Sequence, residues 1–295
     1  FKLKSFIYAG LAAAVFTVTE TPAAELHDCD RLAADPGDPD RPDGVDGIAE
    51  DRIDEEAGLV ACEAAIAAFP NTARFHYQTG RVLWARGEVD AAIEAYEQGA
   101  ALGHALSRYT AVQRHVLLLT YPEDREKSLQ YLRLESLKGY VYAHYALVLF
   151  GLTESGQQRG QQTETSLAPG TDYADALERL MAASASGNGL ASQILAELHI
   201  FNFGYDQYHP KVVGYFKRAA EQGHGPAQAH YGAMHLTGKG APKNATLAAY
   251  WYEEAARQGV KQAQVGLARL YLVGEGVEKD LVRAYAWLLR SGDRG

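Results

Sequence analysis

Apolar and small residues recur three and four positions apart through most of the chain, which is the spacing of one face of an α-helix. Residues 229–236 are a clear case, with a small-residue face interrupted by polar positions. A glycine- and proline-containing turn at 238–242 ends this pattern, and Asn244 can cap a second helix that stops at Gly259. The pattern therefore predicts a pair of helices joined by a short turn.

The same pattern returns with a period of 36 residues. Trp251-Tyr252 takes the place of Tyr215-Phe216 one period earlier, and Trp287 falls one further period on. The run Ala219–Gly223 likewise returns as Ala255–Gly259. Because one such pair cannot bury its apolar face alone, the pairs must stack on one another. The repeat therefore predicts a helical solenoid.

The residue pattern of the repeats resembles that of a known family. Gly-x-Gly-(Val/Ala), Ala-x-x-Trp-Tyr and Ala-Ala-x-Gln-Gly, seen in residues 227–292, are similar to the Sel-one-like repeat (SLR), a relative of the tetratricopeptide repeat (TPR). The resemblance implies an all-α, right-handed α-solenoid of stacked antiparallel helix pairs. It implies less about function, since such arrays are binding scaffolds of many kinds.

Residues 1–24 are predicted to be a signal peptide. Lys2 and Lys4 precede the apolar run Ser5–Val18, and small residues offer cleavage after Ala23 or Ala24. An uncleaved anchor and a buried first helix remain the alternatives. After cleavage no stable membrane span is expected.

Residues 25–52 are predicted to be an acidic, irregular linker. The net charge of −9 is concentrated in residues 25–63, which hold 14 acidic and 3 basic residues. The prolines and glycines of residues 35–44 exclude a helix or central strand, and the spacing of a calcium-binding EF-hand loop is absent. Because no basic cluster occurs, no nucleic-acid partner is expected.

Cys29 and Cys62 are the two cysteines of the chain, and an even number after a signal peptide predicts one disulfide. It would join the acidic segment to a helix expected at residues 54–69, with Asp54 as its cap. Two unrelated thiols are the alternative.

Residues 53–106 are expected to hold this leading helix and one TPR-like pair, and residues 107–295 the SLR-like pairs. A Gln-, Gly-, Ser- and Thr-rich stretch at about 153–170 reads as a flexible insertion between paired helices. The last helix lacks a polar cap, so we expect either a longer chain or a covering subunit at that end.

No catalytic motif, metal site or cofactor site is expected. His115, His199 and His235 share one column of the repeats with apolar residues, which indicates a packing position. A metal site at His199 and His235, with Glu197 nearby, is the alternative.

The predicted binding surface is the concave groove, which the first helix of each pair lines in TPR-like units. Tyrosines recur there in three consecutive repeats, and arginines and a tryptophan flank the first; aromatic and Arg residues commonly anchor interfaces. The candidate partner-binding residues are Arg74, Tyr77, Arg81, Trp84, Tyr109 and Tyr145. Packing of the tyrosines between helices is the alternative. By charge sign, the acidic segment is also expected to lie against Arg74 and Arg81 when no partner is bound.

The leading functional hypothesis is a secreted or periplasmic scaffold of the bacterial envelope that binds another protein or peptide, as a regulator or adaptor, and is not an enzyme. One alternative is an SLR-type hydrolase acting on cell-wall-like substrates. Such proteins carry regular cysteine pairs, which residues 63–295 lack. Another alternative is a regulatory array truncated at Gly295 from a larger enzyme.

Overall fold

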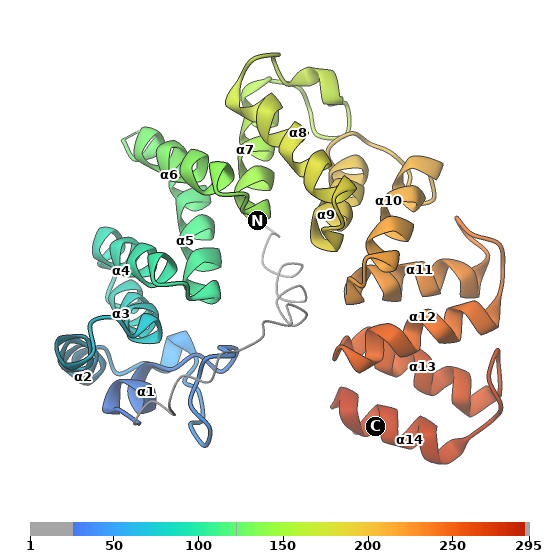
Figure 1. Cartoon of the computed structure of the whole chain (residues 1–295), viewed down its shortest axis with the longest axis horizontal. Helices are drawn as coiled ribbons and strands as arrows, with labels where there is room; N and C mark the ends of the chain where they lie inside the picture. Colours follow the sequence, from blue (N-terminus) through green and yellow to red (C-terminus); the bar gives the residue numbers. More distant parts are fainter. Residues whose placement is uncertain (1–25, 122, 293–295) are drawn as a thin grey trace. The chain divides into compact units, whose positions relative to one another are not determined.

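The computed structural model describes residues 26–121 and 123–292, so the predicted signal peptide lies outside the described residues. The regular elements in this part of the chain are helices, and no strand occurs there. They form stacked antiparallel pairs, which confirms the predicted all-α solenoid (Figure 1). The chain divides at Gly139 into two compact units, which are described separately.

The N-terminal unit extends to Lys138. Its elements are α1 (Asp28–Ala33), the short 3₁₀ helix η2 (Glu50–Arg52), α2 (Glu55–Ala68), α3 (Ala73–Ala85), α4 (Val89–Ala101), α5 (Ala105–Leu118) and α6 (Arg125–Leu137). Helices α3 and α4 pack as a pair, α5 follows on α4, and α1 lies against both α2 and α3.

The C-terminal unit begins at Gly139. Its elements are α7 (Val141–Glu154), the 3₁₀ helix η3 (Glu164–Ser166), α8 (Asp172–Ala185), α9 (Gly189–Phe201), α10 (Pro210–Glu221), α11 (Gly225–Thr237), α12 (Ala245–Arg257), α13 (Lys261–Val273) and α14 (Leu281–Ser291). Successive helices pack on one another along this series.

The helix ends follow from local chemistry. Asp54 caps α2 by accepting from the N–H of Ala57, and Asn244 caps α12 by accepting from Leu247, so both expected caps are confirmed. Helix α11 ends at Gly238 and has a φ of 73° there, a left-handed conformation that glycine adopts without steric cost.

The pairs approach closely because small residues lie where helices touch. Ala255 and Ala263 have no exposed surface, and Leu267 packs in the same core cluster at 1% exposure. Where a pair includes glycine, a large ring takes the space: a Cβ on Gly80 would lie 2.6 Å from the Tyr96 ring. The alternation of small and large residues explains why the repeat pattern is visible in the sequence.

Two segments expected to be irregular are more ordered than predicted. The predicted acidic linker contains the helix α1, because the backbone N–H of His27 donates to Asp30 and the His27 ring accepts from the backbone N–H of Cys29. In the insertion between α7 and α8, a short 3₁₀ turn forms and Leu167 is buried. In both segments a few side chains pack inward although the composition is typical of a solvated loop.

Candidate protein-binding surface

Helix α3 carries four of the six predicted partner-binding residues. Arg74, Tyr77 and Arg81 are at most 8% exposed, and Trp84 is half-buried. Arg74, Tyr77 and Arg81 contact residues 27–48 of the same chain, which we call the acidic segment. We call the side chains of α3 that hold it, together with His104, the α3 surface.

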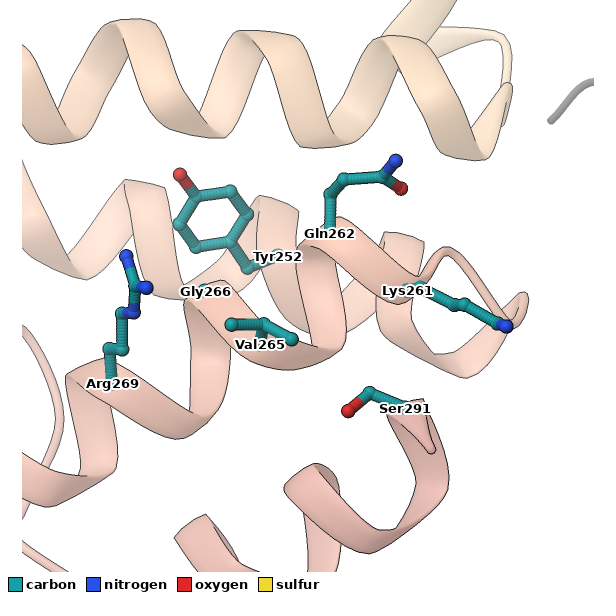
Figure 2. Close-up of a pocket in the computed structure, with 7 residues that line it drawn as sticks. All are labelled: Tyr252, Lys261, Gln262, Val265, Gly266, Arg269 and Ser291. Carbon is teal, nitrogen blue, oxygen red and sulfur yellow. The ribbon is translucent and has the colours of Figure 1, made fainter. Parts of the chain in front are cut away.

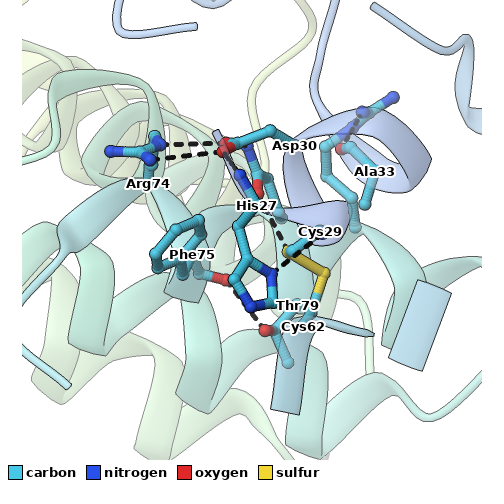
Figure 3. The surroundings of a disulfide bond; sticks show 10 residues. His27, Cys29, Asp30, Ala33, Cys62, Arg74, Phe75 and Thr79 are labelled. Carbon is cyan, nitrogen blue, oxygen red and sulfur yellow. Dashed lines mark hydrogen bonds and ion pairs between the residues drawn. A yellow bond between two sulfur atoms is a disulfide. The ribbon is translucent and has the colours of Figure 1, made fainter. Parts of the chain in front are cut away.

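Arg74 binds the beginning of the acidic segment. Its Nε and Nη2 atoms donate to the two Asp30 oxygens at 2.9 and 3.2 Å, and Gln78 Nε2 donates at 3.0 Å (Figure 3). Burial alone raises the pKa of Asp30, but the hydrogen bonds from Arg74, Gln78 and the backbone of His27 outweigh it. The pKa of this carboxyl is therefore below its ordinary value, and Asp30 is ionised at neutral pH.

Arg81 holds the middle and end of the segment. It donates to the carbonyls of Ala33 and Ile48, each at 2.6 Å, and its Nε lies 3.4 Å from an Asp35 oxygen. The Tyr77 hydroxyl donates to the same carboxylate at 3.0 Å. The expected contact of the acidic segment with Arg74 and Arg81 is thus confirmed.

Trp84 lies at the margin of this surface. The guanidinium of Arg114, on α5, sits 3.6 Å from the centre of the Trp84 ring and 3.5 Å from a Glu50 oxygen. One cation therefore links an aromatic residue of α3 to η2, which follows the acidic segment.

The predicted disulfide is confirmed. Cys29 and Cys62 are bonded and completely buried, and they join α1 to α2 (Figure 3). The covalent link keeps the acidic segment beside the α3 surface.

The two other predicted positions are on later first helices. Tyr109, on α5, is 4% exposed, and its oxygen accepts from Gln113 at 2.8 Å. Tyr145, on α7 of the C-terminal unit, is half-buried, and burial, with the negative charge of Glu197, raises its pKa to about 12. The structure thus brings Arg74, Tyr77 and Arg81 together on one bound segment, and Tyr77 also packs against the ring of Tyr96 on α4.

Sequence reasoning missed two members of this surface, Gln78 and His104. Gln78 follows Arg74 by four residues on one helix and so shares its face, a signal that could have identified it. His104 lies 66 residues from its partner Asp38 and gave no local signal.

Asp38, Asp40 and His104 are the one group of three metal-ligating side chains that comes together in the described residues. His104 Nδ1 accepts from the backbone N–H of Ser107 at 3.1 Å and thereby caps α5. The neutral ring then carries its proton on Nε2, 3.2 Å from Asp38. A protonated ring nitrogen cannot bind a metal, so the geometry favours a hydrogen-bonded His–Asp contact.

Two buried Ser–His–carboxylate arrangements resemble hydrolase triads. In the first, Ser107, His104 and Asp38 are joined, and in the second Ser128 and Glu97 contact His115. Ser107 and Ser128 have no exposed surface, so no substrate reaches either hydroxyl. The first group instead joins the acidic segment to the start of α5, and the second joins α4, α5 and α6.

The alternative metal site at His199 and His235 is not assembled among the described residues. His199 Nδ1 lies 2.6 Å from the Leu195 carbonyl, and His235 Nδ1 lies 3.0 Å from that of Pro242. Both rings pack against aromatic neighbours. Glu197 accepts from Gln193, and burial raises its pKa.

The fold defines an α-helical repeat protein. The Sel1 repeat matches residues 213–224, 225–260 and 261–295, so this part of the chain consists of Sel1 repeats. No curated protein matches the chain.

Three solved structures are similar to parts of the chain. A Sel1 repeat protein from Oxalobacter formigenes is 33% identical over 40% of this chain and 90% of its own, with a TM-score of 0.36. The protein c5321, a protective antigen present in uropathogenic Escherichia coli strains, is 22% identical over 79% of this chain and 49% of its own, with a TM-score of 0.44. Helicobacter pylori cysteine rich protein B is 21% identical over 42% of this chain and 90% of its own, with a TM-score of 0.32.

Within the described residues, none of the helices combines the length and apolar character needed to cross a membrane.

Proposed function

We propose that this chain is a secreted or periplasmic scaffold that binds another protein through its first helices, as a regulator or envelope adaptor. The observation that carries the proposal is the α3 surface. Side chains of a first helix hold about 20 residues of largely irregular chain there, through carboxylates and backbone carbonyls. A partner segment of similar chemistry can be held in the same way by other first helices.

Among the predicted positions, those that solvent reaches are the ones that a partner contacts first. Trp84 and Tyr145 are half-buried aromatic residues on first helices, whereas Arg74, Tyr77, Arg81 and Tyr109 are nearly buried in the free chain. Aromatic side chains give a large contact area with little loss of conformational freedom, which suits them to anchor a partner.

Photo-crosslinking tests the proposal. A benzophenone amino acid replaces Trp84 or Tyr145 in the full chain, expressed in the cells that naturally make it. Tyr250 is the matched control, because it is an aromatic residue of the second helix α12 and is 52% exposed. We expect the same discrete protein adduct from Trp84 or Tyr145 and none from Tyr250. Adducts that are equal at all three positions, or absent from both test positions, contradict the proposal.

The proposed compartment rests on the basic and apolar start of the chain and on the disulfide, since disulfides persist in oxidising compartments. Mass spectrometry of the mature protein from fractionated cells should find a chain shortened by about 23–24 residues in the periplasm or medium. An intact N-terminus in cytoplasmic protein would exclude export.

A further inference from the structure

A shallow depression of about 390 Å³ lies on α13, between α12 and the end of α14 (Figure 2). Val265 and Gly266 form its middle, and the ring of Tyr252 packs 3.1 Å from the position of a Cβ on Gly266. Lys261 and Arg269 lie at its two ends. Eight residues separate these two cations, which is about 12 Å along a helix.

The charges of this depression are unbalanced. Lys261 and Arg269 are exposed, no acidic residue lines the depression, and within residues 26–121 and 123–292 neither cation forms an ion pair. The contrasting case is a depression in the N-terminal unit, where Arg108 and Lys138 both pair with Glu135. Charge complementarity therefore favours an anionic occupant on α13.

Repeat register relates α13 to the helix that holds the acidic segment. Both α3 and α13 are first helices of 13 residues. Arg269 takes the position in α13 that Arg81 takes in α3. Arg81 donates to two backbone carbonyls of the acidic segment and lies beside the carboxylate of Asp35. Gln262 takes the position of Arg74, and Val265 that of Tyr77. The chain thus presents one arginine position twice, with a protein segment on it in the N-terminal unit and with a depression beside it in the C-terminal unit.

We propose that the α13 surface, formed by Lys261, Gln262, Val265, Arg269 and Tyr252, binds an acidic, irregular segment of a partner protein. Arg269 donates to carbonyls or a carboxylate of that segment, as Arg81 does in the N-terminal unit. Lys261 neutralises a second acidic side chain. The inference rests on the proposed scaffold function and adds the chemical class of the partner.

The probe is a fluorescent synthetic peptide of residues 28–48 with Cys29→Ser, because this sequence is the known occupant of the α3 surface. Fluorescence anisotropy measures its binding to the full chain at low salt. We expect Lys261→Gln with Arg269→Gln to weaken binding by about tenfold or more. Lys243→Gln with Arg257→Gln is the matched control, because it removes two exposed cations of the same unit. This control should bind as the unchanged protein does.

With this peptide, the inference is overturned if the unchanged chain does not bind it, if both double variants weaken binding equally, or if neither double variant weakens binding. Equal binding would place the peptide elsewhere, for example on the α3 surface after exchange with the chain's own segment. A peptide with asparagine in place of its aspartates should bind more weakly, and undiminished binding also overturns the inference. Crosslinking from Trp84 and Tyr145 uses other residues and a natural partner, so failure here is distinguishable from failure of the scaffold function.

Discussion

Replacement of Asp30 by asparagine is the sharpest test of how the acidic segment is held. Asp30 has no exposed surface and accepts four hydrogen bonds, two of them from Arg74. An asparagine keeps the shape, but it removes the charge and turns one acceptor into a donor. That donor faces other donors, and the Arg74 guanidinium remains buried without its counter-ion. Removal of one partner of a buried pair costs about 3–5 kcal/mol.

Because the disulfide keeps Cys29 attached, we expect the loss to appear first as local opening of the segment. A cost of about 3 kcal/mol corresponds to roughly a 150-fold larger open population. Hydrogen exchange of the amides of α1, with the disulfide intact, measures that population. Asp28→Asn is the matched control in the same helix, since the Asp28–Arg31 pair is exposed and worth at most about 1 kcal/mol.

The dependence on pH gives an independent check. The pKa of Asp30 is lowered in the folded chain, so its stabilising effect is complete above the unfolded value of about 3.9 and is lost as pH falls below it. The unchanged chain should therefore open in acid, and Asp30→Asn should lack this part of the dependence. The reasoning is refuted if Asp30→Asn opens the segment no more than Asp28→Asn. It is also refuted if adding Arg74→Met to Asp30→Asn only sums the two single costs.

Three further outcomes can be measured. The thiols of Cys29 and Cys62 should resist alkylation until reduced, and Cys62→Ser should lower stability by about 3–4 kcal/mol in denaturant titrations; free labelling would disprove the bond. Burial lowers the pKa of His224 to about 4, so stability should fall as the pH is lowered from about 6.5 to 4, because the unfolded chain takes up the proton first. His224→Asn should reduce this fall, and an unchanged dependence of stability on pH in that variant would contradict the prediction. Gly80→Ala should lower the melting temperature, with a cost of about 1–3 kcal/mol from overlap with a tyrosine ring. Gly214→Ala, whose Cβ meets no atom within 4 Å, should leave stability unchanged or raise it. A larger loss of stability in Gly214→Ala than in Gly80→Ala would contradict the prediction.

The sequence by itself determined the helix pairs and their stacking. Gly238 and Gly274 stop helices one period apart, and Asn244 caps the next, because these are local effects of backbone conformation and hydrogen bonding. The disulfide was also predictable, since the chain offers two cysteines and a single pairing.

Only the tertiary structure decided how the candidate surface is used. Charge sign predicted attraction between the acidic segment and the arginines. It could not assign Asp30 to Arg74 across 44 residues, or Asp35 rather than a neighbouring aspartate to Tyr77. Such assignments depend on where the backbone places each carboxylate, and no local pattern encodes that.

The tyrosine column shows the same division. Repeat register placed Tyr77, Tyr109 and Tyr145 at equivalent positions, yet their surroundings differ. The Tyr77 hydroxyl is bound by Asp35 of the acidic segment, Tyr109 is equally buried and is bound by Gln113 of its own helix, and Tyr145 remains half-buried. A period in the sequence fixes the side of a helix on which a residue lies, since that depends on 3.6 residues per turn. What covers that side depends on contacts between distant segments, and these form only when the whole unit folds.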